Sequence, residues 1–501
     1  MDGSSNHNSD PNPAHIILIP FMAQGHMIPM VDLARLLASS GALVTFITTP
    51  VNAARIHPII ECLKNSHLPI NFVQLPFPSV DVGLPDGCEN VDLISSPDLF
   101  KPFMKALSLF GEQVKLYLTA TNLTVVPANC IIFDSMNSWV GAMAESLGIP
   151  HIIFYGPSCF YILCAHLLKK HQVLKSINDD YELFKVPELP EPVEVMKAQV
   201  MRLMDRPGWE KESEEFYETE KSACGVVMNT FEELEKSSLD KFRKEIGKKV
   251  WPIGPFSLAN KDSVSKAVRG KASSIDTGLL LSWLDSKTPN SVMFVSFGSL
   301  SRNPISQLVQ IGQGLESASS SQLSFIWVVN DADKSEEVEK WLSEFEERMK
   351  GRGIVIRGWA PQAMILGHVA VGGFMTHCGW NSTLEAIAAG VVMATWPRFG
   401  DQFVNERLVV DVLRIGVAVG AKVPTLFVDE MSEKALVKGE EVRKVVEKVM
   451  QGGEEGEERR KRARELAEKA RKAMEEGGSS FENLKRIVQF AKGENKHSLS
   501  L

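Results

Sequence analysis

The sequence predicts an α/β protein with two doubly wound parallel-sheet domains that face each other across a cleft. Short apolar, β-branched runs alternate with longer segments of helical spacing, and this alternation occurs in two separate series. A polar stretch without a periodic apolar face lies between the series. Strands that are apolar throughout are typical of parallel sheets covered by helices on both faces.

The first series opens with a strand, a helix and a second strand, at residues 15–20, 27–40 and 43–48. The helix is predicted because its apolar residues recur every three or four positions and form one face. Together the three elements make a βαβ unit, from which parallel sheets are built. Further strands of this series are expected at residues 70–75, 130–134, 151–155 and 225–229.

The chain changes character at residues 256–277, which are rich in Ser, Lys, Asp and Ala and predict an irregular linker. Strands of the second series are expected at residues 291–297, 325–329, 353–356, 371–376 and 391–396. We therefore expect two Rossmann-like domains, at residues 1–255 and 278–475. Ligands of such sheets bind at the carboxyl ends of the strands, which places the expected site in the cleft.

The end of the chain predicts two helices. Residues 452–478 are a dense run of Glu, Arg and Lys, typical of a solvated helix with i,i+4 ion pairs, and a binding surface is the alternative. The sequence Ser479-Ser-Phe-Glu482 matches a capping box that opens the last helix. We expect residues 476–501 to pack back on the N-terminal domain.

Composition and charge exclude several classes of protein. The 501 residues carry a net charge of −8, and no basic block interleaved with aromatic residues indicates nucleic-acid binding. No apolar run approaches the roughly 20 residues that a bilayer requires, and the first thirteen residues lack the positive charge of a signal peptide. Seven cysteines without a C-x-x-C pair indicate reduced thiols. We expect a cytoplasmic monomer.

The densest group of polar and aromatic residues lies between Trp359 and Gln402. The strand expected before His377 runs into a glycine turn, and a helix begins near Asn381. Backbone N–H groups and the positive end of the helix dipole then converge beside the side chains of His377, Asn381 and Ser382. This arrangement predicts a diphosphate site.

Neighbouring residues complete a nucleotide-sugar site. Glu385 lies one helical turn after Asn381, where its carboxylate can accept both hydroxyls of a ribose. Trp359 offers a flat face for a base, and Asp401 and Gln402 offer polar groups for further hydroxyls. Each feature alone has an ordinary structural explanation. Their order along the chain favours a site for base, ribose, diphosphate and sugar.

A candidate acid–base pair comes from the first domain. His26 follows the first expected strand, and Asp134 ends another strand of the same sheet. Taken singly, such residues are more often structural. An imidazole positioned by a buried carboxylate, however, can take the proton of a hydroxyl and make it nucleophilic.

Residues 359–402 resemble, almost position by position, the signature box of the plant family 1 UDP-sugar-dependent glycosyltransferases, which act on small natural products. The resemblance extends to residues 20–38, 130–150, 282–301 and 477–484 and so spans essentially the whole chain. It implies the two-domain GT-B architecture, with the acceptor bound by the N-terminal half and the UDP-sugar donor by the C-terminal half.

The resemblance also implies residue roles. His26 and Asp134 fall at the catalytic positions, Trp359 would stack on uracil, and Glu385 would hold the ribose. The full set of implied donor-binding residues is Ser299, Trp359, Ala360, Gln362, His377, Gly379, Trp380, Asn381, Ser382, Glu385, Asp401 and Gln402.

Details of the signature box bear on the sugar. Gln402 resembles the choice associated with glucose rather than the histidine associated with galactose. Val392 replaces a common proline, and Gly400-Asp401 replaces a common Ala-Glu, which shortens the carboxylate side chain by one methylene. The resemblance implies UDP-glucose as co-substrate.

The implied reaction is a direct, inverting displacement at the anomeric carbon that yields a β-glycoside, a hexosyl transfer. We predict no further cofactor, because UDP is a good leaving group and the helix N-terminus with His377 stabilises its charge. Asp331-Ala-Asp333 is a D-x-D sequence of the kind that binds divalent ions, but it lies outside the signature box, and we predict metal-independent transfer.

Other activities predict other residues. A UDP-sugar epimerase of the same fold would not need the pair His26 and Asp134, and a non-catalytic UDP-sugar-binding protein would be favoured by its loss. A sugar phosphorylase would carry a lysine for pyridoxal phosphate, which no local signal indicates. A nicotinamide dehydrogenase would show G-x-G-x-x-G after an early strand, and the sequence shows none there.

The acceptor is expected to be a small, apolar, hydroxylated molecule, and the resemblance points to flavonoids and other phenolics, triterpenoids or steroids. Its pocket is predicted from apolar and aromatic residues in loops after strands of the first domain. These are Phe21, Met22, Met136, Trp139 and Tyr155.

Overall fold

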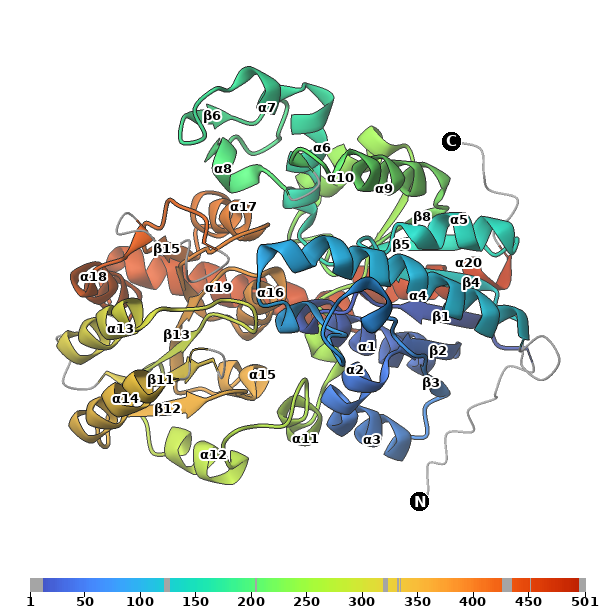
Figure 1. Ribbon diagram of the computed structural model, residues 1–501. Helices are drawn as coiled ribbons and strands as arrows, with labels where there is room; N and C mark the ends of the chain where they lie inside the picture. Colours follow the sequence, from blue (N-terminus) through green and yellow to red (C-terminus); the bar gives the residue numbers. More distant parts are fainter. Residues whose placement is uncertain are drawn as a thin grey trace.

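The computed structural model describes residues 12–120, 127–202, 205–318, 323–330, 333, 335–425, 435–450 and 452–494. Two parallel sheets, each flanked by helices, lie side by side (Figure 1). The strands of the first third of the chain lie on one side of the molecule, and those of the last third lie on the other. The predicted α/β class with two parallel sheets is confirmed.

The first sheet has the strand order β3-β2-β1-β4-β5-β8-β9, and all neighbouring strands are parallel. The central strands are buried along their whole length, which explains their continuous apolar runs. The strand bounds are β1 (His15–Ile19), β2 (Leu43–Thr48), β3 (Ile70–Gln74), β4 (Cys130–Asp134), β5 (His151–Tyr155), β8 (Gly225–Met228) and β9 (Lys249–Pro252). A small antiparallel pair consists of β6 (Leu183–Lys185) and β7 (Glu194–Met196).

The second sheet has the order β12-β11-β10-β13-β14-β15 and is also parallel throughout. The expected second series differs from these strands by at most one residue at either end, and the short β15 was not expected. The strand bounds are β10 (Val292–Ser296), β11 (Ser324–Val329), β12 (Gly353–Arg357), β13 (Val371–Thr376), β14 (Val392–Thr395) and β15 (Gly416–Ala418).

Helices cover both sheets. Those of the first half are α1 (Gln24–Ser39), α2 (Pro50–Arg55), α3 (His57–Asn65), α4 (Phe100–Ala120), α5 (Trp139–Ser146), α6 (Cys159–Lys170), α7 (Val173–Ser176), α8 (Lys197–Val200), α9 (Glu210–Ser222) and α10 (Lys236–Ile246), with short 3-10 turns at Val80–Val82, Val91–Leu93 and Pro97–Leu99. Those of the second half are α12 (Thr277–Asp285), α13 (Ile305–Ser317), α14 (Glu336–Arg348), α15 (Gln362–Leu366), α16 (Trp380–Ala389), α17 (Gln402–Arg407), a π-helical turn at Leu408–Val412, and α18 (Gly439–Met450).

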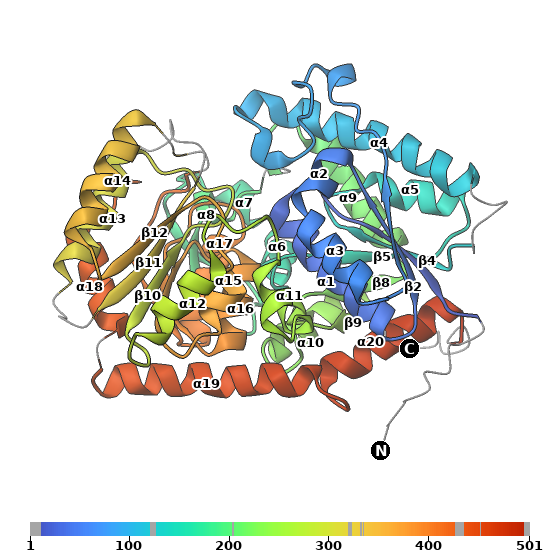
Figure 2. The same cartoon turned by 90° about the horizontal axis from the view of Figure 1, so that it is seen from below.

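Residues 256–277 are more ordered than the sequence predicts. They contain a 3-10 turn at Phe256–Ala259 and the short helix α11 (Ser263–Ala267), and α11 lies between the two halves (Figure 2). Their polar composition reflects buried polar contacts to both halves, which are described below. Residues 268–276 are irregular, as expected, but the 3-10 turn, α11 and the buried contacts were not expected, because composition does not distinguish exposed polar residues from buried, paired ones.

The last two helices, α19 (Glu454–Met474) and α20 (Ser479–Lys492), return the chain to the first half (Figure 2). Ser480 Oγ donates to the Gly254 carbonyl at 2.6 Å and Asn483 Nδ2 to the Pro252 carbonyl at 3.0 Å. The charged helix α19 shows the expected i,i+4 ion pairs, yet its alanines are buried against α16. The capping box was wrong, because Gly478 is the N-cap of α20 and Ser479 donates to Glu233 instead.

No helix among the described residues is both long and apolar enough to cross a bilayer. All seven cysteines are free thiols.

Candidate functional site

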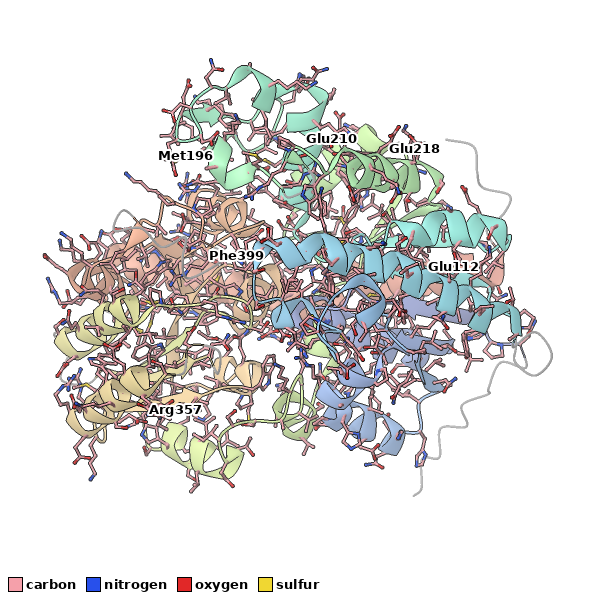
Figure 3. The ribbon with its side chains drawn as sticks, in the orientation of Figure 1. Glu112, Met196, Glu210, Glu218, Arg357 and Phe399 are labelled. Atoms are coloured by element: carbon pink, nitrogen blue, oxygen red, sulfur yellow. The ribbon has the colours of Figure 1, made fainter. Side chains whose placement is uncertain are left out.

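A cleft of about 410 Å³ opens where the carboxyl ends of strands from both sheets meet. His26 follows β1, Ser299 follows β10, Trp359 follows β12 and His377 follows β13. The cleft is lined by His26 and by all twelve expected donor residues. Phe399, labelled in Figure 3 where the halves meet, also lines it. Parallel strands place the residues of each half at the carboxyl edge of its own sheet, and the cleft lies where the two edges face each other.

His26 and Asp134 form a hydrogen-bonded pair. His26 Nδ1 lies 2.7 Å from Asp134 Oδ2, and the second carboxylate oxygen accepts the backbone N–H of Met136 at 3.0 Å. Asp134 is fully buried behind the imidazole, whereas the His26 side chain is 29% exposed to the cleft. Because Nδ1 faces the carboxylate, Nε2 is the nitrogen available to a ligand.

Burial lowers the pKa of His26, but the charge and hydrogen bond of Asp134 outweigh burial, with a contribution from Asp401, and raise the pKa above 6.5. Asp401, whose charge contributes to this pKa, belongs to the opposite half of the molecule and is the N-cap residue of α17. The Phe21 and His26 rings also pack against each other at a steep angle, with 5.2 Å between ring centroids. The imidazole is therefore held in one orientation with Nε2 directed away from Asp134.

The N-terminus of α16 faces the same cleft. Cys378 adopts a left-handed backbone conformation (φ 65°) and Gly379 is the N-cap, so the chain turns sharply from β13 into the helix. The first N–H groups of a helix have no partner inside it and point outward. The segment thus presents free N–H donors and the positive end of a helix dipole.

The His377 ring lies close to two glycines. A Cβ atom on Gly298 would lie 2.7 Å from the Cε1 and Nε2 atoms of the ring, and one on Gly379 would lie 2.4 Å from Nε2. Burial, helped by the charge of Arg398, lowers the pKa of His377 to about 4, so the ring is neutral near pH 7. The buried Nδ1 has no partner among the described residues.

The side chains of the first turn of α16 link the two halves. Asn381 Nδ2 donates to the Gly25 carbonyl, and Trp380 Nε1 donates to the Asn229 carbonyl at 2.7 Å. These bonds place the helix N-terminus directly opposite the start of α1, which carries His26.

The Trp359 end of the cleft holds a buried carboxylate. Gln362 Nε2 donates both to Glu385 Oε2 at 2.9 Å and to Ser382 Oγ at 3.0 Å. Arg269 of the linker donates to the other oxygen of Glu385. Ala360, next to Trp359, lines the same wall.

Asp401 and Gln402 lie at the start of α17. Gln402 Oε1 accepts the backbone N–H groups of Arg398 at 2.8 Å and Phe399 at 3.1 Å, which leaves Nε2 as the free polar atom. Burial, opposed by a hydrogen bond from Asn405, raises the pKa of Asp401 to about 6.

The five residues predicted for the acceptor pocket do not line this cleft. Tyr155 is 1% exposed, and its hydroxyl donates to Glu220 within the core. Met22 is fully buried, Phe21 packs against His26 and Phe103, and Trp139 packs against Phe110. Met136, half-buried, packs against the core. Met22 and Tyr155 are therefore core residues, and an acceptor-facing role for Phe21, Met136 and Trp139 stays a prediction.

Sequence reasoning missed a group of cations in the cleft wall. Arg55, Lys271 and Arg302 gather around Asp92, whose carboxylate pairs with the first two and whose carbonyl accepts from the third. Arg269 was missed as well. The only signal was the cation pair flanking Gly270 in a segment that composition assigned to a linker.

Among the described residues, no group of three or more His, Cys, Asp or Glu side chains is arranged to hold a metal ion. Asp333 Oδ1 accepts the backbone N–H of Asn303 at 3.1 Å. Asp331 lies outside the described residues. Metal independence stays a prediction.

Two family models match the chain. One is described as "Glycosyltransferase, N-terminal domain" and matches residues 12–258, and the other, "UDP-glucoronosyl and UDP-glucosyl transferase", matches residues 209–451. The chain is 45% identical to UDP-glycosyltransferase 73C6 of Arabidopsis thaliana over 97% of its own length and 99% of that protein.

Solved structures agree. The crystal structure of UGT73P12 from Glycyrrhiza uralensis, complexed with glycyrrhetinic acid 3-O-monoglucuronide, matches with a TM-score of 0.87 and 36% identity over 96% of each chain. That of UGT89C1 from Arabidopsis thaliana, complexed with UDP-L-rhamnose, matches with a TM-score of 0.73 and 29% identity over 96% of this chain and 99% of that one.

Proposed function

This chain belongs to the plant family 1 UDP-sugar-dependent glycosyltransferases, and we propose that it transfers glucose from UDP-glucose to a hydroxyl of a small lipophilic plant natural product, giving a β-O-glucoside. It is a glycosyltransferase with a GT-B fold that uses a UDP-sugar and a small-molecule acceptor. The proposal adds the sugar and the acceptor class, a flavonoid or other phenolic, a triterpenoid or a steroid. A cytoplasmic location and a monomeric state stay predictions.

One observation carries the proposal: the His26–Asp134 pair and the N-terminus of α16 face each other across one cleft. We assign acceptor binding to residues 1–255 and donor binding to residues 278–475. A non-catalytic binder has no use for an oriented base opposite a diphosphate site, and no observation favours an epimerase.

In the proposed reaction His26 Nε2 takes the proton of the acceptor hydroxyl, and Asp134 stabilises the imidazolium that forms. The acceptor oxygen forms a bond to the anomeric carbon from the face opposite UDP. The bond from that carbon to the phosphate oxygen breaks, and its electron pair leaves with UDP. The N–H groups of α16 and neutral His377 stabilise the charge on the leaving phosphate.

Gln402 is expected to hydrogen-bond the sugar through Nε2 alone, because its Oε1 already accepts two backbone N–H groups. Gln402→Glu keeps that acceptor and replaces the free donor by an oxygen. We expect UDP-glucose to bind about tenfold more weakly and UDP to bind as before, measured by titration calorimetry. Equal losses for both ligands would show that Gln402 does not contact the sugar.

The pH dependence of transfer follows from the pair His26 and Asp134. The base works only when Nε2 is unprotonated, so activity falls as the pH falls through the pKa of His26, which lies above 6.5. Asp134→Asn removes the charge that raises this pKa and is expected to move the acidic limb to lower pH. The rate is measured at saturating UDP-glucose, because Asp401 titrates near pH 6. An unmoved limb would contradict the assignment of the base.

The proposal itself is tested by incubating the protein with UDP-glucose and other UDP-sugars and a panel of phenolic, triterpenoid and steroid alcohols. Products are identified by mass, and the anomeric configuration by NMR. We expect β-glucosides, formed equally well after exhaustive EDTA treatment. The absence of product with every hydroxylated acceptor would contradict the proposal. Activity that is lost with EDTA and restored only by Mn²⁺ or Mg²⁺ would contradict its metal-free form.

A further inference from the structure

Arg269 of the linker bridges both halves of the molecule at the donor end of the cleft. Its Nε donates to Asp32 Oδ2 of α1 at 2.8 Å, and its Nη1 donates to Glu385 Oε1 of α16. All three side chains are at most 8% exposed. Asn260, also in the linker, donates to the second oxygen of Asp32 at 2.8 Å. The guanidinium is thus fixed from one side and holds Glu385 from the other.

A buried carboxylate depends on such a partner. An ionised carboxylate is strongly disfavoured in a dry environment unless it is paired and hydrogen-bonded. Arg269 supplies the charge, and Gln362 donates to the other oxygen of Glu385 at 2.9 Å. A carboxylate oxygen accepts more than one hydrogen bond, so both oxygens of Glu385 can still accept ribose hydroxyls from the cleft. The two donors fix the plane of the carboxylate.

The same linker segment packs on Trp359. Gly270 has φ +110°, and a Cβ atom there would lie 2.1 Å from Cζ2 of the Trp359 ring, so only glycine fits. Ser274 N donates to the Trp359 carbonyl and Trp359 N donates to Ser274 Oγ, both at 2.8 Å. Residues 269–274 therefore hold both Trp359 and Glu385.

We propose that Arg269 is a positioning residue for the UDP donor: it orients the Glu385 carboxylate toward the ribose hydroxyls, while Gly270 packs on the Trp359 ring and Ser274 holds the Trp359 backbone. This inference rests on the proposed function, in which Glu385 accepts the ribose hydroxyls. It makes the linker part of the nucleotide site and not merely a connection between the halves.

The test compares UDP with 2′,3′-dideoxy-UDP, which lacks the ribose hydroxyls, by titration calorimetry on the full-length protein. Arg269→Gln is expected to weaken UDP binding about 10- to 100-fold and to leave 2′,3′-dideoxy-UDP binding within about twofold. Arg269→Lys, which keeps the charge and one hydrogen bond, is expected to restore part of the loss and serves if the Gln variant does not fold. Lys266→Gln is the control. It removes a half-buried linker cation that bonds neither Glu385 nor Trp359 in the described structure, so the affinities for UDP and for 2′,3′-dideoxy-UDP should not change.

The outcomes separate the inference from the proposed function. If Arg269→Gln and Arg269→Lys lose affinity equally for UDP and for its dideoxy analogue, Arg269 has only a structural role. If the variants bind UDP more tightly, Arg269 competes with the ribose for Glu385. Either result overturns the inference. Glu385→Gln tests the proposed ribose contact independently. If this variant still prefers UDP over its dideoxy analogue as strongly as the parent protein does, the proposed ribose assignment fails, whatever Arg269 does.

Discussion

Replacing His26 by alanine is expected to lower the rate of glycosyl transfer by about 10²–10⁴-fold, the usual contribution of a positioned general base. The acceptor hydroxyl then keeps its proton during attack, because no other described group of the cleft is paired with Asp134. UDP should bind almost as tightly as before, since the groups assigned to UDP belong to the second half. The measurements are single-turnover rates and UDP titrations.

A smaller loss is expected for Asp134→Asn, because His26, the base itself, is still present and loses the carboxylate that orients it and stabilises the imidazolium. A His26→Ala variant that retains more than about a tenth of the rate would remove the base assignment. Strong loss of UDP binding in that variant would mean that the substitution disturbs the contact of Gly25 with Asn381 instead.

Replacing Gly298 by alanine is expected to lower kcat/KM for UDP-glucose by about 100-fold. The new methyl group would meet the His377 ring at 2.7 Å, and Gly379 also lies so close to Nε2 of that ring that a Cβ there would be 2.4 Å away. The ring therefore moves away from the position in which we propose that it meets the phosphate. Overpacking of this kind costs about 1–3 kcal/mol, and the left-handed φ of +76° adds strain.

Gly351→Ala is the matched control. Gly351 has nearly the same φ, +81°, but its Cβ would have no neighbour within 4 Å, and it lies in the turn between α14 and β12. Gly351→Ala should cost stability in thermal unfolding without changing kcat/KM. If both variants lose kcat/KM equally, backbone strain and not the His377 ring explains the effect.

The central strands could be predicted because their burial is uniform. Strands β4, β5 and β13 begin and end at the expected residues, since each is a short apolar, β-branched run bounded by polar or glycine-rich sequence. Strand β9 was not expected, because it begins with lysine and ends at a proline. Helix α1 begins three residues before the expected start, which places His26 on the helix itself.

The cleft could be predicted for a topological reason. Residues that follow parallel strands lie at the carboxyl edge of their sheet, so His26 could be placed at that edge of the first sheet and His377 at that of the second without knowing a contact. The position of Arg269 in the cleft could not be predicted, because its partners Asp32 and Glu385 are 237 and 116 residues away along the chain. A charged residue in a polar segment gives no sign of whether it is solvated or buried and paired.

The acceptor side was the least predictable part. Tyr155 and Met22 have the composition of a pocket wall, but large apolar side chains fill a core equally well, and only packing decides between the two. Specific recognition of a small apolar molecule depends on shape, which the order of residues does not encode locally.

Because α20 hydrogen-bonds to the carbonyls of Pro252 and Gly254, the polypeptide passes between the two halves twice, once through residues 256–277 and once through α19 and α20. A protease that cuts the first passage leaves a nicked molecule still joined by the second. Chimeras of two relatives can be made to combine the acceptor preference of one with the donor preference of the other. A chimera with a single crossover point would take α20 from one parent and the sheet on which α20 packs from the other. The transferable first half is therefore discontinuous and needs the last helix of its own parent.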